Sequence, residues 1–378
     1  MHNRHSHYVH LMAVIAGFAG WLAMISGSWG DTPEFEKQLK EVQKALRKPS
    51  SPGAIQRLLD ETLEIIDAAM LDDKYTLASR AVVTAQEAAL KLKSKHAEFR
   101  VNQRKEEIKK ISSEYKKLAS LLKKLSTDAD DANANKTVGL FRVLIADQLL
   151  MGAPLLEKSK VPALVELGRL EQQKQTEVAG QVALAKLWKS AATDETGLIS
   201  VGMERRAYYW YQQALRQAVG KEHDEISLAM DEFSFRYLTD MQETVTKPVA
   251  PFGKYGKLRG ETPIQVDGIG SEFGLGMGVG KENTLVVQYQ LNGMYKTFQA
   301  CCALQDGDAD GRDAGGGIVF SVVGDGRVLW RSSPLKPGNK FETSNVDIKR
   351  VRTLELITAS PEQIWGGHGV WLDPILLK

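Results

Sequence analysis

Four aspartates within eight residues are the groups of this chain best suited to hold an ion. They stand in the stretch DGDADGRD as Asp306, Asp308, Asp310 and Asp313. Side-chain oxygens at alternate positions can converge on one hard cation, and calcium prefers such ligands. An EF-hand would continue with Glu at the twelfth position, where this chain has Gly317. The spacing suggests a calcium loop that is not an EF-hand. The alternative is an acidic turn that binds no metal. The sequence suggests no cofactor other than calcium.

A second candidate lies in the segment IWGGHG, which places Trp365 and His368 three residues apart among glycines. A sugar site needs a flat aromatic face for the C–H side of the ring and a few polar groups for its hydroxyls. The glycines favour an exposed Trp365, and His368 could orient a hydroxyl. Structural roles stay open for both: a Trp365 ring folded back onto the domain, and a His368 bonded to nearby backbone.

Patterns typical of enzymes are missing from the sequence. Beyond residue 30 the histidines are His96, His223 and His368, and none stands beside a nucleophile motif. No motif brings two carboxylates together as a glycoside hydrolase requires. The Gly-rich stretch 274–280 is followed by an expected strand, so it lacks the helix that a phosphate site needs. We therefore expect a protein that is not an enzyme.

Both candidate loops fall within residues 262–378, where apolar residues alternate with polar ones. Eight expected strands follow one another there: TPIQVDGIG, TLVVQYQLN, YKTFQACCAL, GIVFSVV, RVLWRSS, NVDIKR, TLELITA and GVWLDPIL. This number predicts an antiparallel β-sandwich of the jelly-roll type. Trp330 and Trp371 have apolar neighbours and are expected in the core. Cys301 and Cys302 are adjacent, so a bond between them would be strained, and both are expected to be buried thiols.

Residues 31–241 are rich in good helix formers and predict an all-α region of helical hairpins. Ser51 and Pro52 mark one helix start, and residues 94–124 read as one long helix with a buried face. Consecutive aromatic residues at 208–211 span all faces of a helix, which favours interhelix packing over a ligand groove. Two prolines and three glycines in residues 242–260 predict that 242–261 is a linker to the sandwich.

The first thirty residues follow the pattern of an export signal, with Arg4, an apolar run from Leu11 to Ile25 and small residues up to Gly30. The run is shorter than the roughly 20 residues that span a bilayer, which favours a cleaved signal over an uncleaved anchor. Cleavage after Gly30 fits best, and Gly27 is the alternative. We expect a mature protein without a transmembrane span in the periplasm, on the cell surface or outside the cell. The net charge of +2 argues against a nucleic-acid partner.

Five motifs in order resemble the carbohydrate-binding-like module known from family 98 glycoside hydrolases (the NPCBM type), a galactose-binding-like sandwich. They are Gly268-Ile269-Gly270-Ser271, Tyr295-Lys296-x-Phe298, Val319-Phe320-x-Val322 running into Asp325-Gly326-x-Val328-Leu329-Trp330, Leu354-Glu355-Leu356, and His368-Gly369-x-Trp371-x-Asp373. Glu272 stands where that family often has a His, and Gly367 where an Asp usually precedes the His. The resemblance implies sugar binding and adds Glu272 to Trp365 and His368 as a candidate ligand residue.

The helical region carries a looser resemblance to tetratricopeptide-like hairpins. Residues 152–158, 183–188 and 206–215 are similar to segments of exported bacterial proteins that join helical hairpins to a C-terminal sugar-binding-like sandwich. The first hypothesis is thus an exported, non-catalytic protein that binds carbohydrate through the sandwich and uses the helices as a spacer or for protein contacts. The second is a scaffold whose sandwich binds proteins and no sugar.

Overall fold

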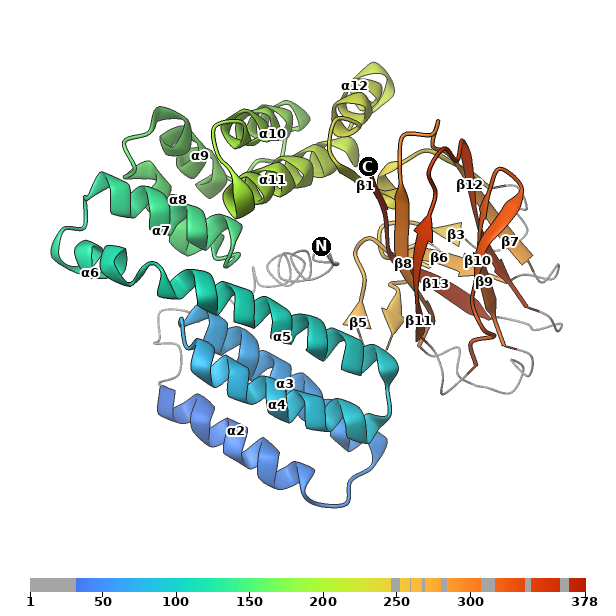
Figure 1. Ribbon diagram of the computed structural model, residues 1–378, viewed down its shortest axis with the longest axis horizontal. Coiled ribbons are helices and arrows are strands. Elements are labelled where there is room, and N and C mark those ends of the chain that lie inside the picture. Colours follow the sequence, from blue (N-terminus) through green and yellow to red (C-terminus); the bar gives the residue numbers. More distant parts are fainter. Residues whose placement is uncertain are drawn as a thin grey trace. The chain divides into compact units, whose positions relative to one another are not determined.

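The structure, a computed structural model, divides into a helical unit and a β-sandwich unit (Figure 1). The helical unit comprises residues 32–91 and 101–233, and the sandwich unit residues 92–100 and 234–378. The described residues are 32–245, 252–258, 260–266, 269–279, 284–306, 317–336, 341–360 and 367–378. The expected export signal lies outside them. None of the helices in these ranges is long and apolar enough to cross a membrane.

Residues 32–230 run as a succession of helices of 9 to 22 residues. In order they are α2 (Thr32–Leu46), α3 (Pro52–Leu71), α4 (Tyr75–Leu92), α5 (Lys95–Lys116), α6 (Ala119–Thr127), α7 (Ala132–Leu144), α8 (Leu149–Glu157), α9 (Pro162–Gln172), α10 (Val178–Ala192), α11 (Gly197–Leu215) and α12 (Gly220–Met230). The predicted all-α region is thereby confirmed. The expected long helix over 94–124 is interrupted, because α5 ends at Lys116 and α6 begins at Ala119.

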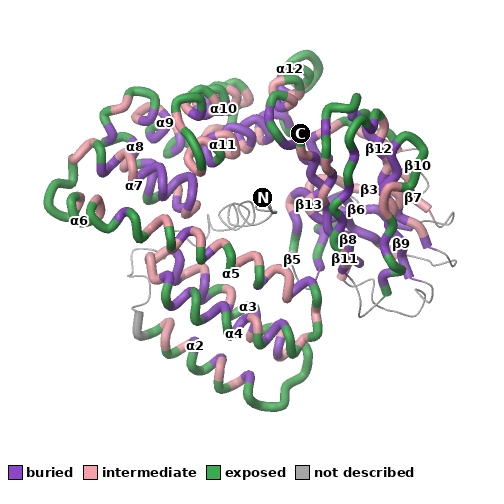
Figure 2. The backbone as a smooth tube through the Cα atoms, in the orientation of Figure 1, coloured by how far each residue is buried: buried purple, intermediate pink, exposed green. Residues whose placement is uncertain are grey.

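Local sequence explains how these helices start and pack. Ser51 caps α3, its Oγ accepting a hydrogen bond from the Ala54 N–H at 3.3 Å, and Pro52 occupies the first turn. One face of α3 and of α4 is buried (Figure 2). Among the aromatic residues 208–211, Tyr208, Trp210 and Tyr211 are buried, as the packing interpretation predicts.

The sandwich consists of two antiparallel sheets. The first has the order β11-β8-β13-β6-β3 with β1 also on β13, the second has the order β10-β9-β12-β7-β2, and β4 and β5 form a small ribbon. The strands are β1 (Phe235–Tyr237), β2 (Glu243–Val245), β3 (Phe252–Gly253), β4 (Gln265–Val266), β5 (Ile269–Gly270), β6 (Leu275–Gly278), β7 (Thr284–Gln290), β8 (Thr297–Leu304), β9 (Val319–Gly324), β10 (Arg327–Arg331), β11 (Phe341–Asp347), β12 (Thr353–Ala359) and β13 (His368–Leu377). The predicted sandwich is confirmed.

Several strands differ from the sequence-based expectation. β1, β2 and β3 precede residue 262, in segments for which the sequence predicts helix and linker. β1 pairs with the last strand through Phe235 and Leu377, so its partner lies 142 residues away in the chain. β6 occupies the Gly-rich stretch, and β11 begins at Phe341, four residues before the expected strand at 345.

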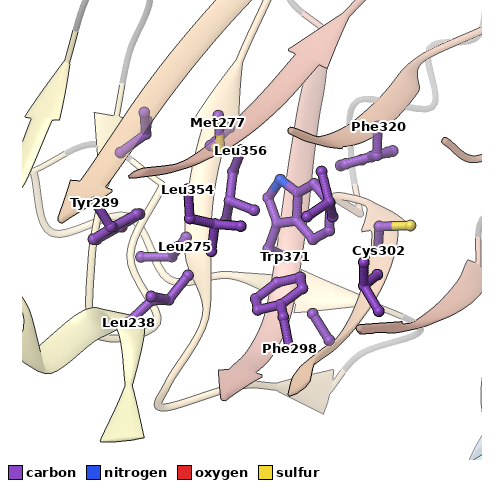
Figure 3. Packing of buried hydrophobic residues seen from close by; sticks show 14 of the residues in the cluster. Leu238, Leu275, Met277, Tyr289, Phe298, Cys302, Phe320, Leu354, Leu356 and Trp371 are labelled. Carbon is purple, nitrogen blue, oxygen red and sulfur yellow. The ribbon is translucent and has the colours of Figure 1, made fainter. Parts of the chain in front are cut away.

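The main core lies between the two sheets, around Trp371 (Figure 3). The Trp371 ring is fully buried, with its centroid 5.3 Å from that of Phe320 and 5.9 Å from that of Phe298. Trp330 is half-buried and packs against the same core. Cys301 and Cys302 are buried free thiols, as expected. The core thus fixes β13, the strand that begins at His368.

Candidate functional site

One end of the sandwich gathers the strand termini from which both candidate loops leave. The antiparallel register pairs His368 of β13 with Gly278 of β6, and Gly369 with Leu304 at the end of β8. In the other sheet, Ala359 at the end of β12 pairs with Thr284 and Val319, which begin β7 and β9. We call this the His368 end. Loops that leave such strand termini are held by a rigid scaffold.

Hydrogen bonds connect the segments of the His368 end. The Gln305 N–H donates to the His368 carbonyl at 3.1 Å, and the Asp306 N–H donates to the Gln265 carbonyl at 2.8 Å. The side chain of Gln305 is buried, and its Oε1 accepts from the Gln265 N–H at 2.8 Å. Sequence reasoning missed Gln305, because its partners lie 40 residues or more away in the chain. Through it, the start of the acidic loop and the start of β13 are neighbours.

The structure places the predicted site residues unequally. Asp306 and His368 are partly buried and lie on neighbouring segments of the His368 end. Trp365, Asp308, Asp310 and Asp313 lie outside the described residues. The calcium loop and the aromatic loop therefore stay predictions, and both depart from the same end of the sandwich.

Glu272 lies on a segment that leaves that end. It precedes β6, whose Leu275 pairs with Trp371, and its neighbour Ser271 donates through Oγ to Asp373 Oδ1 at 3.0 Å. Asp373 lies five residues along β13 from His368, roughly 17 Å at the usual rise of a strand. Gly270, two residues before Glu272, pairs with Gln265 of the His368 end, so Glu272 lies on a segment that leads from that end to Asp373.

Other polar groups of the sandwich offer little chemistry. No group of three or more His, Cys, Asp or Glu side chains that could hold a metal occurs among the described residues. Burial raises the pKa of the thiols of Cys301 and Cys302, so both stay protonated near neutral pH. Protonated thiols are poor nucleophiles and poor metal ligands, and they act here as small apolar groups.

In the helical unit, charged side chains from several helices surround Asp147. This residue links α7 to α8 and has a left-handed backbone, with φ of 54°. Burial raises the pKa of Asp147 to about 7; the Arg206 guanidinium lowers it, Glu107 raises it and Arg104 lowers it. Glu107 itself accepts a hydrogen bond from Arg104 at 2.6 Å. Asp147 is thus the carboxyl group whose charge costs the native helical unit free energy near neutral pH.

This cost predicts a dependence of stability on pH. With a native pKa near 7 and an unfolded pKa of about 3.9, the native state binds more protons between these values. The free energy of unfolding should therefore fall as the pH rises from about 4 to about 7, by about 2 kcal/mol after allowance for partial exposure. Asp147→Asn should flatten the profile and stabilise the protein at pH 8, because Asn tolerates the left-handed backbone.

Urea unfolding at pH 5 and pH 8, followed by far-UV circular dichroism, measures this effect. Asp194→Asn is the matched control, because the Asp194 side chain is exposed and has no hydrogen bond or ion pair with another described residue, so this variant should depend on pH as the unaltered protein does. Equal pH profiles for Asp147→Asn and the unaltered protein would show that Asp147 has an ordinary pKa.

Comparison with known proteins supports the description of the sandwich. Residues 236–377 match the family model of the NPCBM/NEW2 domain, which confirms the resemblance found in the sequence. No curated protein matches the chain.

Three solved structures are similar to the sandwich at low identity, and each comparison covers 38% of this chain. The CBM51 module of a Clostridium perfringens GH95 enzyme, in complex with methyl-galactose, is 21% identical, is covered to 99% of its length and gives a TM-score of 0.31. The tandem CBM51 modules of a family 98 glycoside hydrolase from Streptococcus pneumoniae are 20% identical, covered to 47%, with a TM-score of 0.32. The M60 catalytic domain with two CBM51 domains from Clostridium perfringens ZmpB is 20% identical, covered to only 15%, with a TM-score of 0.32.

Proposed function

We propose that this chain is an exported, non-catalytic protein that binds carbohydrate at the His368 end of its sandwich. The helical unit then serves as a spacer or as a region for protein contacts. The observation that carries the proposal is the NPCBM/NEW2 match over residues 236–377. It is supported by the hydrogen bond from the Gln305 N–H to the His368 carbonyl, which holds the end of β8 beside the start of β13. The export signal in the first thirty residues supports a place outside the cytoplasm.

The arrangement of the His368 end suits binding better than catalysis. Strand termini hold the loop ends in place, and the buried Gln305 side chain fixes β4 against β8. Such rigid support reduces the ordering cost of binding a small polar ligand. Trp365 would stack on the sugar ring, His368 would orient a hydroxyl, and calcium held by the acidic loop would fix that loop.

The alternative is a scaffold that binds proteins and no sugar. It is favoured by the exposed large apolar side chains of the described residues, most of which belong to the helical unit: Val83, Leu90, Leu150, Met151, Val201, Val219 and Leu228. Single exposed apolar side chains are ordinary, so the scaffold requires that some of these gather into one contact surface. They are compatible with the first proposal too, since the helices could bind a protein while the sandwich binds a glycan.

Glycan-array binding of the full-length protein tests the proposal. We expect a neutral glycan to bind, and Trp365→Ala to weaken that binding roughly tenfold through the loss of stacking. His368→Ala should weaken it as well, whereas His223→Ala in α12 is the matched control and should bind normally. Addition of a chelator should lower the affinity if the acidic loop holds calcium. An array without any bound glycan would contradict the proposal and favour the scaffold.

A further inference from the structure

The end of the sandwich opposite to the His368 end is formed by three turns, at residues 291–296, 324–327 and 348–352. Backbone hydrogen bonds hold them together: the Leu291 N–H donates to the Arg352 carbonyl at 2.7 Å, the Gly293 N–H to the Val351 carbonyl at 3.0 Å, and the Asp325 N–H to the Thr353 carbonyl at 3.0 Å. We call this surface the arginine end. The seven residues of β12, Thr353–Ala359, separate it from the His368 end by roughly 20 Å.

Three exposed arginines, Arg327, Arg350 and Arg352, lie on these turns. No ion pair joins any of them to another described residue. The acidic residues beside them already have partners. Asp325 accepts hydrogen bonds from the backbone N–H groups of Arg352 and Thr353 at 2.9 to 3.2 Å, and Asp347 pairs with Lys349 at 3.2 Å. With five basic residues, which include Lys296 and Lys349, against the two carboxylates Asp325 and Asp347, the arginine end keeps a net charge of +3.

The backbone conformation defines the shape of these turns. Arg350 has φ of 65°, in the left-handed region that non-glycine residues seldom adopt. Asn292 and Asp325 on the adjoining turns also have positive φ, but Asn and Asp accept this conformation readily. Lys93 and Lys160 share this conformation, with φ of 55° and 59°, so the backbone of Arg350 defines the shape of its turn and is not by itself a sign of binding.

We propose that the arginine end is a second ligand site, which binds an acidic polysaccharide through its carboxylate or sulfate groups. The planar guanidinium group presents two parallel N–H donors that match the oxygens of either anion. The amide of Asn292, exposed on the turn next to Arg350, offers a donor and an acceptor for sugar hydroxyls. The arginines lie on separate turns, so a ligand that contacts all of them needs several spaced negative charges. A polysaccharide of repeating anionic sugars has such charges.

Nucleic acids fit this surface less well. An anionic membrane typically attracts four to eight basic residues, and these turns carry five, namely Lys296, Arg327, Lys349, Arg350 and Arg352. The vesicle measurement below therefore decides between a membrane and a polysaccharide. Binding to single-stranded nucleic acid uses exposed aromatic rings as stacking platforms. The one aromatic residue in these turns, Tyr295, is buried. Duplex binding commonly involves six to ten phosphate contacts, more than these turns supply.

The test measures binding of the full-length protein to polygalacturonate, to dextran sulfate and to neutral dextran at low and high salt. We expect one or both acidic polymers to bind, neutral dextran not to bind, and the affinity to fall with salt. Binding to polygalacturonate would indicate a preference for carboxylate groups, and binding to dextran sulfate a preference for sulfate groups. The variant R327Q/R350Q/R352Q should bind about tenfold more weakly and depend less on salt.

Arg331→Gln is the matched control, because it removes one exposed positive charge from β10 away from the three turns and should retain binding. His368→Ala should also retain it, so that failure of the carbohydrate site at the other end can be told apart from failure here. Unchanged binding by the triple variant would overturn the proposal. Tighter binding of DNA or of phosphatidylserine vesicles than of either acidic polymer would overturn it as well.

Discussion

Replacing Glu171 with alanine should destabilise the helical unit by about 3–5 kcal/mol, because the change leaves a buried positive charge without its partner. The Glu171 side chain is fully buried, whereas Arg206 is about one-tenth exposed. Arg206 donates from Nε to Glu171 Oε1 at 2.7 Å and from Nη2 to Oε2 at 2.5 Å. The indole N–H groups of Trp188 and Trp210 donate to the same Oε1 at 2.7 and 2.9 Å. One carboxylate thus satisfies donors from α10 and α11, and its loss leaves three side chains without an acceptor.

Urea unfolding followed by tryptophan fluorescence measures this loss, since two of the donors are indoles. Glu166→Ala on the same helix, α9, is the control. Glu166 forms an exposed pair with Arg169, and exposed pairs contribute only about 0.2–1 kcal/mol. Glu171→Gln should be intermediate, because the amide keeps one acceptor oxygen but has no charge to offer Arg206. If the Glu171→Ala and Glu166→Ala proteins unfold at the same urea concentration, the buried network does not stabilise the unit.

Sequence reasoning could place Glu171 but could not identify its role. Leu164, Leu167, Gly168 and Glu171 follow a spacing of three and four, so the helical period alone puts Glu171 on the buried face of α9. Its partners come from residues 17 to 39 positions further on. The local sequence does not indicate which basic side chain pairs with a buried carboxylate when the two residues lie on different helices.

The strands also differ in how far the local sequence predicts them. β7 and β12 have clear alternation of buried residues, and the sequence predicts both. β1 and β2 are three residues long and pair with β13 and β7, far along the chain. A strand of three residues is too short to show an alternation of apolar and polar side chains. It can be identified only from the strand with which it pairs.

For the candidate site, the sequence predicts that loops between strands carry the polar and aromatic groups, and this stays a prediction because Trp365, Asp308, Asp310 and Asp313 lie outside the described residues. The family resemblance adds Glu272 to His368 as a candidate ligand residue, yet Ser271 beside Glu272 bonds to Asp373, which lies five residues along β13 from His368. Gln305, which connects Asp306 to His368, has no motif that marks it. Composition alone does not reveal the arginine end. The net charge of +2 sums over the whole chain and hides a local excess of positive charge.

Trp371→Ala should destabilise the sandwich by about 3–5 kcal/mol, the usual cost of truncating a buried aromatic residue. The ring packs between Phe298, Phe320 and Trp330, so its loss leaves a cavity between the two sheets. Trp371→Phe is the control for hydrogen bonding. Nε1 has no acceptor among the described residues, so phenylalanine loses volume but no hydrogen bond and should cost less.

Chemical unfolding of both variants, followed by near-UV circular dichroism, compares these costs. Because Trp371 lies three residues after His368 on β13, the alanine variant should also bind glycan more weakly at temperatures where the sandwich is still folded. The cavity loosens the strand that begins at His368, whereas the arginine end depends on the turns before β12 and should keep its ligand. An alanine variant that unfolds at the same denaturant concentration as the unaltered protein would mean that Trp371 does not anchor the core.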